Sequence, residues 1–249
     1  MRRFGLRWSE LRDSLVRAEQ WILPGSCLLC DEEVRDDSLI CDTCCQRFSR
    51  LPHPQCHRCG QPLSPGIDCR LCMTWPARFD QVQSAVWLDD GARRAVHLLK
   101  YDGWWRVADA MAQVIASSVS IPCQATLIPI PLSAGRERTR GYNQSAVLAE
   151  AVAKRLGVRV LPVLRRGRDT GTQTALTPEA RRANLAGAFA VGGTPPVNPV
   201  LVDDVFTTGA TLAEAAQALL AAGAPQVSGV TFARAVRPLA DAVASLSSR

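Results

Sequence analysis

Apolar residues follow two alternating periodicities from about residue 76 onward. Short apolar runs predict strands near 81–88, 125–130, 158–164, 199–203 and 226–233. Between these runs, apolar residues recur every three or four positions, which predicts helices near 91–100, 104–119, 143–156, 178–186 and 211–222. Because strands and helices alternate along the chain, we predict an α/β fold in which helices cover a parallel sheet.

The first 75 residues follow a different pattern. Four apolar residues would share one face of a short amphipathic helix over 6–22, namely Leu11, Leu15, Ala18 and Ile22. The stretch that follows is rich in cysteine and has few other side chains that could build a core. We therefore predict three parts, a helical lead-in at 1–23, a cysteine-rich region at 24–75 and the α/β domain at 76–249.

Eight of the ten cysteines form four C-x-x-C pairs, which is the spacing of metal-binding knuckles. The pairs are Cys27 with Cys30, Cys41 with Cys44, Cys56 with Cys59, and Cys69 with Cys72. Two knuckles supply the four thiolates of a tetrahedral zinc site, so the chain predicts two structural zinc sites. Consecutive pairing is favoured because it needs only short hairpins, while interleaved pairing stays open.

Other uses of these residues are less favoured. Redox-active C-x-x-C pairs would require a strand followed by a helix, a context that is missing here. His53 and His57 stay open as replacement ligands, Cys45 is a spare thiol, and Cys123 is expected in the core. A site closed by four thiolates leaves no position for catalysis, which indicates a structural or docking role.

Charge and hydropathy narrow the possible partners. The formal charge is +6, but eight thiolates and two zinc ions would reduce it to about +2. Residues 136–182 still contain eleven Arg or Lys against four Asp or Glu. No apolar run approaches the roughly 20 residues that span a bilayer. No apolar stretch of a signal peptide follows the basic N-terminus, so we expect a cytoplasmic protein without membrane insertion.

The stretch "LVDDVFTTGAT" at 201–211 combines two acids with a Thr- and Gly-rich turn before a predicted helix. Backbone N–H groups at such a turn, together with the helix dipole, favour a phosphate. The two acids would repel that phosphate, so a matching ligand carries an anion at one end and hydroxyls or a metal ion at the other. A ribose 5-phosphate has this form. A plain helix cap at Asp204 or Thr208 is the simpler alternative.

These residues resemble the signature of the type I phosphoribosyltransferases. With "LLKYDG" (98–103), "IPIPLSAGRERTRGYNQSAVLAE" (128–150), "TQTALTPEARRANLAGAF" (172–189) and the cysteine pairs, the chain resembles the ComF family of competence and DNA-utilisation proteins, including its GntX subgroup. This resemblance implies a double zinc ribbon followed by a phosphoribosyltransferase domain.

The resemblance also implies the ligand and its contacts. Asp203 and Asp204 would bind the ribose hydroxyls of phosphoribosyl pyrophosphate, which is used with magnesium. The 5-phosphate would be held by Thr207, Thr208, Gly209, Ala210 and Thr211. Arg136 and Arg140 could face the diphosphate, although a solvated basic loop is the alternative. Lys100 would pair with the ligand or serve as a cation at a helix end, with equal weight.

Three functions stay open from the sequence. The first is a phosphoribosyltransferase acting in DNA uptake or utilisation, whose acceptor is not indicated because no base-selecting motif is recognisable. The second is a non-catalytic factor that binds single-stranded DNA through the basic stretch and the zinc knuckles. Trp75, Trp87, Trp104 and Trp105 could add stacking faces, although we expect three of these four tryptophans to be buried in the core. The third is a regulator that senses phosphoribosyl pyrophosphate without turnover. Proteins of DNA uptake are the expected protein partners.

Overall fold

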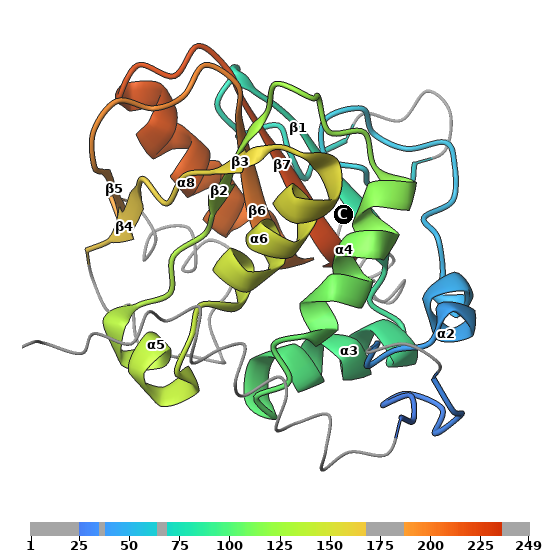
Figure 1. The fold of residues 1–249 in the computed structure, drawn as a ribbon. Coiled ribbons are helices and arrows are strands. Elements are labelled where there is room, and N and C mark those ends of the chain that lie inside the picture. Colours follow the sequence, from blue (N-terminus) through green and yellow to red (C-terminus); the bar gives the residue numbers. More distant parts are fainter. Residues whose placement is uncertain (1–24, 35–37, 64–68, 168–186, 236–249) are drawn as a thin grey trace, which may run out of the picture.

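The computed structural model describes residues 25–34, 38–63, 69–167 and 187–235. Its centre is a five-stranded parallel sheet with the order β1-β7-β6-β2-β3 (Figure 1). The strands are β1 (Phe79–Trp87), β2 (Thr126–Pro129), β3 (Arg159–Val160), β6 (Pro199–Phe206) and β7 (Val227–Arg234). The α/β class and the parallel sheet predicted from the alternating pattern are confirmed.

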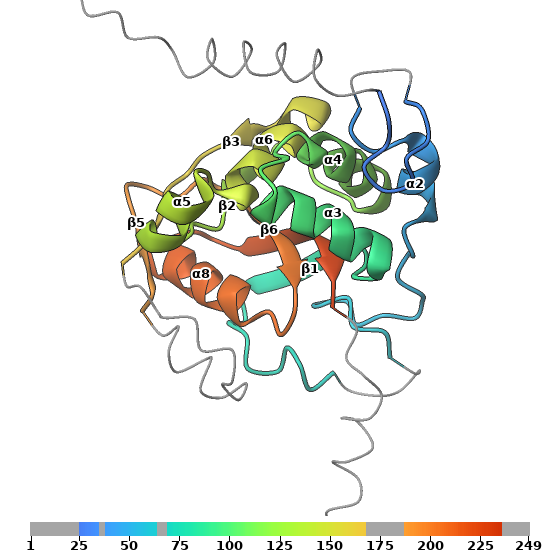
Figure 2. The same ribbon diagram turned by 90° about the horizontal axis from the view of Figure 1, so that it is seen from below.

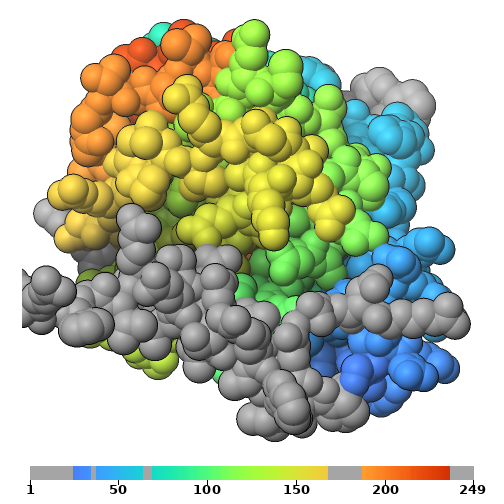
Figure 3. Space-filling view, viewed as in Figure 1, coloured from blue at the N-terminus to red at the C-terminus, as the bar shows by residue number. Residues whose placement is uncertain are grey.

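Helices cover both faces of the sheet. On one face lie α4 (Val107–Ser118) and α6 (Gln144–Leu156), which cross the view in Figure 1, and α8 (Ala210–Ala221) lies on the other. Figure 3 shows α4 and α6 closing over the sheet, with the blue cysteine-rich residues beside them. Asp89 caps the start of the α3 helix (Asp90–Tyr101), because its carboxylate accepts a hydrogen bond of 2.9 Å from the N–H of Ala92.

Three details differ from the sequence prediction. The expected strand at 158–164 is only two residues long in the main sheet, and β4 (Leu164–Arg166) instead pairs antiparallel with β5 (Phe189–Val191). Two helices were not predicted, α2 (Asp42–Arg47) and α5 (Ala134–Arg140). The helices expected at 6–22 and 178–186 lie outside the described residues.

The two cysteine groups pack on opposite faces of the sheet. Cys27 and Cys44 are buried in the core that contains α4 and α6, whereas Cys59 and Cys72 are buried in the core beneath α8. The alternation of β6 agrees with this division, because Val200 and Val202 belong to the first core and Leu201 belongs to the second. The cysteine-rich region therefore braces both layers of the α/β domain.

The strand order changes direction between β2 and β6. The chain moves outward from β2 to β3 on one side, and from β6 to β7 on the other. Figure 2, seen from below, shows α3, α5 and α8 arranged around the end of β6. Such a switch point opens a crevice at the carboxyl ends of the strands, where ligands bind in sheets of this kind. Within the described residues no helix is both long and apolar enough to cross a membrane.

Candidate functional site

The eight paired cysteines form two separate four-sulfur clusters. Each cluster combines consecutive pairs, Cys27, Cys30, Cys41 and Cys44 in one and Cys56, Cys59, Cys69 and Cys72 in the other, with all four sulfurs within 4.8 Å of one another. Sulfur–sulfur distances of 3.8, 3.7, 3.7 and 3.5 Å were found. A zinc tetrahedron with bonds of about 2.3 Å has edges of about 3.8 Å, so both clusters fit zinc.

This geometry selects consecutive pairing of the knuckles. Neither His53 nor His57 belongs to a cluster. In the first cluster the N–H groups of Leu29 and Cys41 donate to the Cys27 sulfur at 3.4 and 3.3 Å. Burial of Cys27 opposes ionisation, yet these N–H groups together lower the pKa of its thiol to about 7, which favours metal binding.

The remaining two cysteines lie outside the clusters. Cys45 is buried against the first ribbon, where burial raises the pKa of its thiol to about 11. Cys123 is exposed, so its expected place in the core was wrong. It lies in the turn before β2, where the chain crosses the surface.

A pocket of about 380 Å³ opens at the carboxyl ends of β2 and β6. Six of the residues singled out from the sequence line it, namely Lys100, Arg136, Asp203, Asp204, Thr207 and Thr211. Its size falls within the usual range of small-molecule sites. The other four, Arg140, Thr208, Gly209 and Ala210, are not among the residues that line it.

The two acids end up in different environments. Asp204 is buried, pairs with the Lys100 ammonium, and accepts a hydrogen bond of 3.3 Å from the Gln144 amide. Asp203 is half buried and accepts a hydrogen bond of 2.7 Å from the Ser145 hydroxyl. Burial, and then the charge of Asp204, raise the pKa of Asp203 to about 7.

The turn after β6 leads directly into α8. Gly209 is the N-cap residue of the helix; it has a left-handed φ of 75° and no side chain of its own to cap the helix. The Thr208 hydroxyl accepts from the N–H of Ala210 at 3.4 Å, and the first turn of α8 contains no acidic residue. The simple-cap reading at Asp204 does not apply, because Asp204 is still in β6. At Thr208, however, the hydroxyl already accepts from the first N–H of the helix, as the cap alternative expects. Among the described residues the N–H groups of Thr211 and Leu212 have no such partner and are available to an anion.

Helix α5 carries both predicted arginines. Arg136 is exposed and lines the pocket. Arg140 donates a hydrogen bond to Gln144 and lies over the Tyr101 ring, with 5.4 Å from the guanidinium carbon to the ring centroid. Its neighbour Asn143 caps α6 by accepting from the N–H of Ser145 at 3.0 Å.

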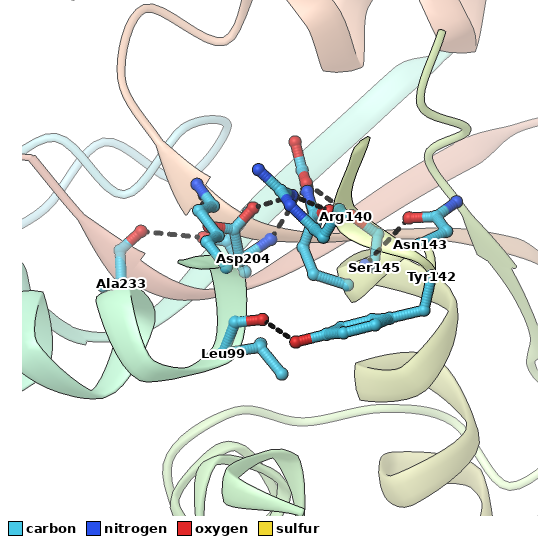
Figure 4. A network of polar contacts seen from close by, with 11 residues as sticks. Leu99, Arg140, Tyr142, Asn143, Ser145, Asp204 and Ala233 are labelled. Atoms are coloured by element: carbon cyan, nitrogen blue, oxygen red, sulfur yellow. Dashed lines mark hydrogen bonds and ion pairs between the residues drawn. The ribbon is translucent and has the colours of Figure 1, made fainter. Parts of the chain in front are cut away.

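Several residues of the pocket were not identified from the sequence. His97, Tyr101, Arg93 and Arg166 line it, and Ser145 supports Asp203 from behind. Tyr142, in the turn between α5 and α6, donates its hydroxyl proton to the carbonyl of Leu99 in α3 (Figure 4). The α3 residues share an i, i+4 spacing on one helix face, but no local pattern indicates that this face meets the end of β6.

The tryptophans are distributed differently from the expectation. Trp75 is buried, whereas Trp87, Trp104 and Trp105 are half buried. Only one of these four tryptophans, Trp75, is therefore buried, and the other three keep some exposed surface.

Comparison with known proteins yields a domain and a set of relatives. Residues 18–73 match the double zinc ribbon domain. The chain is 32% identical over 218 residues to the DNA utilization protein YhgH of Salmonella typhi, covering 82% of this chain and 95% of that protein. It is 29% identical over 230 residues to the competence protein ComFC of Bacillus subtilis, covering 84% and 94%. Identity to the ComFC of Streptococcus pneumoniae is 25% over 223 residues, covering 84% and 99%.

Two zinc-ribbon clusters, a parallel α/β domain and relatives that align over most of both chains agree with one another. The chain belongs to the ComF family, which includes the YhgH and ComFC proteins.

Proposed function

We propose that this protein binds phosphoribosyl pyrophosphate with magnesium and acts in DNA uptake or utilisation. The observation that carries the proposal is the shared pocket of Asp203, Asp204 and Thr207, which lies at the switch point of the sheet. Two carboxylates and the start of α8 converge there from one short segment of chain.

The acids suit the ribose and its metal ion. A hard cation such as magnesium prefers carboxylate, hydroxyl and phosphate oxygens. Asp203 and Asp204 would accept hydrogen bonds from the ribose 2- and 3-hydroxyls, and the metal would neutralise charge on the ligand when bound. Ser145 and Gln144 hold the two carboxylates in place.

The turn at the start of α8 suits the 5-phosphate. We assign this contact to the backbone and hydroxyls of Thr207, Thr208, Gly209, Ala210 and Thr211. The N–H groups of Thr211 and Leu212 and the positive end of the helix dipole both favour an anion.

The diphosphate would lie toward α5. Arg136 projects into the pocket, and we assign it, with Arg140, to that group, because a guanidinium can give two hydrogen bonds to one phosphate. Arg140 also donates a hydrogen bond to Gln144. Lys100, already beside Asp204, would be the third cation of the site.

Turnover would be transfer of the phosphoribosyl group to an acceptor, with loss of diphosphate. Positioning and charge stabilisation by the arginines and magnesium would carry such a step. Relatives named for competence and DNA utilisation support the cellular process. We also propose a cytoplasmic location, and the division into 1–23, 24–75 and 76–249.

Isothermal titration calorimetry tests whether the proposed ligand binds. Phosphoribosyl pyrophosphate should bind with magnesium present and more weakly without it. The double variant Asp203→Asn, Asp204→Asn should lose this dependence. Asp80→Asn, an exposed acid at the opposite end of the sheet, is the matched control and should bind like the parent. Equal affinity with and without magnesium would contradict the proposal.

A second candidate is single-stranded DNA binding. It is favoured by exposed cations on and after α5, namely Arg136, Arg138, Lys154, Arg155, Arg159 and Arg165. Part of the basic stretch, including Arg168, Arg181 and Arg182, lies outside the described residues. A third candidate, sensing of phosphoribosyl pyrophosphate without reaction, would use the same pocket.

A further inference from the structure

The backbone of Gly209 lies directly on two aromatic rings. A Cβ atom added there would stand 2.5 Å from a ring carbon of Trp75 and 2.8 Å from one of Phe206. Neither distance is possible for a real side chain, and φ is +75° at this residue. The rings of Trp75 and Phe206 are 6.0 Å apart and inclined at 60°. Together they form a floor under the phosphate loop, which we define as residues 207–211.

Trp75 belongs to the second zinc ribbon. It follows Cys72 by three residues, and its backbone N–H donates a hydrogen bond of 3.2 Å to the Cys72 carbonyl. Arg58, between the ligands Cys56 and Cys59, donates to that same carbonyl at 3.1 Å and to the Pro76 carbonyl at 2.9 Å. The zinc ligands and Trp75 are thus parts of one hydrogen-bonded unit.

Arg234 connects this ribbon to the other half of the floor. It is only 1% exposed, and its guanidinium carbon lies 4.2 Å from the centroid of the Phe206 ring. Its nitrogens donate to the Cys59 carbonyl at 2.6 Å and to the Gln61 side chain at 2.8 Å. A zinc ion with four thiolates carries a net charge of roughly −2, which compensates a neighbouring buried cation.

The first zinc ribbon has no comparable connection among the described residues. Its aromatic residue Phe48 packs edge-on against Phe232 at 5.4 Å, in the core on the other face of the sheet. The two ribbons therefore brace different layers, and the rings beneath the phosphate loop connect to the second ribbon alone.

We propose that the second zinc centre positions the phosphate loop, with Trp75 and Arg234 as its positioning residues. The assignment of a phosphate ligand to this loop rests on the proposed function, whereas the ordering of the loop does not. Zinc at Cys56, Cys59, Cys69 and Cys72 holds the floor in place, so its loss disorders the loop and weakens ligand binding. Zinc at the first cluster has no such effect.

Hydrogen exchange of the amides at 207–211, followed by mass spectrometry on the zinc-loaded full chain, tests this without any ligand. Trp75→Ala should speed exchange of the loop at least about tenfold, because local opening becomes easier. Trp75→Phe should restore most of the protection. Phe48→Ala is the matched control, since it removes an aromatic side chain from the first ribbon and should leave loop exchange unchanged.

A second pair of variants addresses the metal directly. Cys69→Ser and Cys30→Ser each remove one partly exposed ligand, from the second and first cluster respectively. We expect the amides of the phosphate loop to exchange faster in Cys69→Ser but not in Cys30→Ser. The amount of bound zinc is measured in both variants. Arg234→Met should speed loop exchange as Trp75→Ala does, while all eight cysteine ligands remain. A full zinc content in Arg234→Met would then show that this variant has not simply failed to fold.

Binding of phosphoribosyl pyrophosphate with magnesium is measured on the same proteins. A weaker affinity in Trp75→Ala, recovered in Trp75→Phe, supports the inference. Equal loop exchange in Trp75→Ala and Phe48→Ala overturns it. If the parent protein fails to bind the ligand, the proposed function is wrong, and the exchange data still decide the role of the second zinc centre.

Discussion

Lys100 on α3 and Asp204 on β6 form an ion pair in the wall of the pocket. The Asp204 side chain is almost fully buried, and the Lys100 side chain is about one-fifth exposed. Lys100 supplies a positive charge beside two adjacent acids, which favours their ionised forms.

Replacing Lys100 should transfer this role to magnesium. Lys100→Met leaves Asp204 without its cation, which should lower the free energy of unfolding by about 1–3 kcal/mol at pH 8. Magnesium chloride should then raise the melting temperature more in the variant than in the parent. Scanning calorimetry with and without magnesium measures both effects, and an identical response in the two proteins would rule out this role.

The titration of Asp203 should make the stability depend on pH. Because the pKa rises from 3.8 to about 7 on folding, the folded protein binds this proton more tightly than the unfolded chain does. Stability from this group is therefore complete at low pH and is lost as pH rises through about 7. Between pH 6 and 8 the parent should lose stability more steeply than Asp203→Asn in urea unfolding. Parallel profiles, at unchanged zinc content, would contradict this reasoning.

Purified protein should contain two zinc ions per chain, as the two four-sulfur clusters predict. Native mass spectrometry should give about one zinc for Cys69→Ser, because serine is a poor zinc ligand. A strong chelator should lower the melting temperature sharply, since part of the folding free energy comes from the metal. Freshly purified protein without metal would refute the assignment.

Thr208→Glu should abolish binding of phosphoribosyl pyrophosphate. A carboxylate placed at the start of α8 would occupy the phosphate position and repel the ligand. Thr208→Ser is the conservative control, and Ser117→Glu adds the same charge on an exposed surface of α4. Zinc content should stay unchanged in all three.

The same variant also tests the cellular role. Cells with Thr208→Glu should be impaired in DNA uptake or in growth on DNA. Normal activity despite lost ligand binding would assign the function to the zinc ribbons and the basic surface instead.

If single-stranded DNA binds electrostatically, the logarithm of its affinity should fall linearly with the logarithm of the salt concentration. Replacing Arg136, Arg138 and Arg165 with Gln should reduce the slope by up to about 2, from roughly 0.7 for each phosphate contact. Fluorescence anisotropy at several salt concentrations measures this. An affinity that does not depend on salt would exclude the basic surface as the contact.

Local sequence determined the zinc ligands, most of the strands and helices of the α/β domain, and the residue types of the segment at 201–211. C-x-x-C knuckles and short gaps favour pairing of neighbouring knuckles, and the sulfur clusters select that pairing over the interleaved one. The strand order, the short β3 and the small β4–β5 sheet were decided by pairing between segments far apart in the chain. Such pairing depends on register and packing, which local periodicity does not encode.

The tertiary structure alone decided how the pocket is supported. Ser145 reaches Asp203 across 58 positions of sequence, and Arg234 reaches Cys59 across 175. Nothing near Trp75 in the sequence indicates that its ring lies beneath Gly209. Residue type and spacing specify which groups can bind zinc or phosphate. Burial, the approach of one backbone to a distant ring and the compensation of a buried charge exist only once the layers have packed.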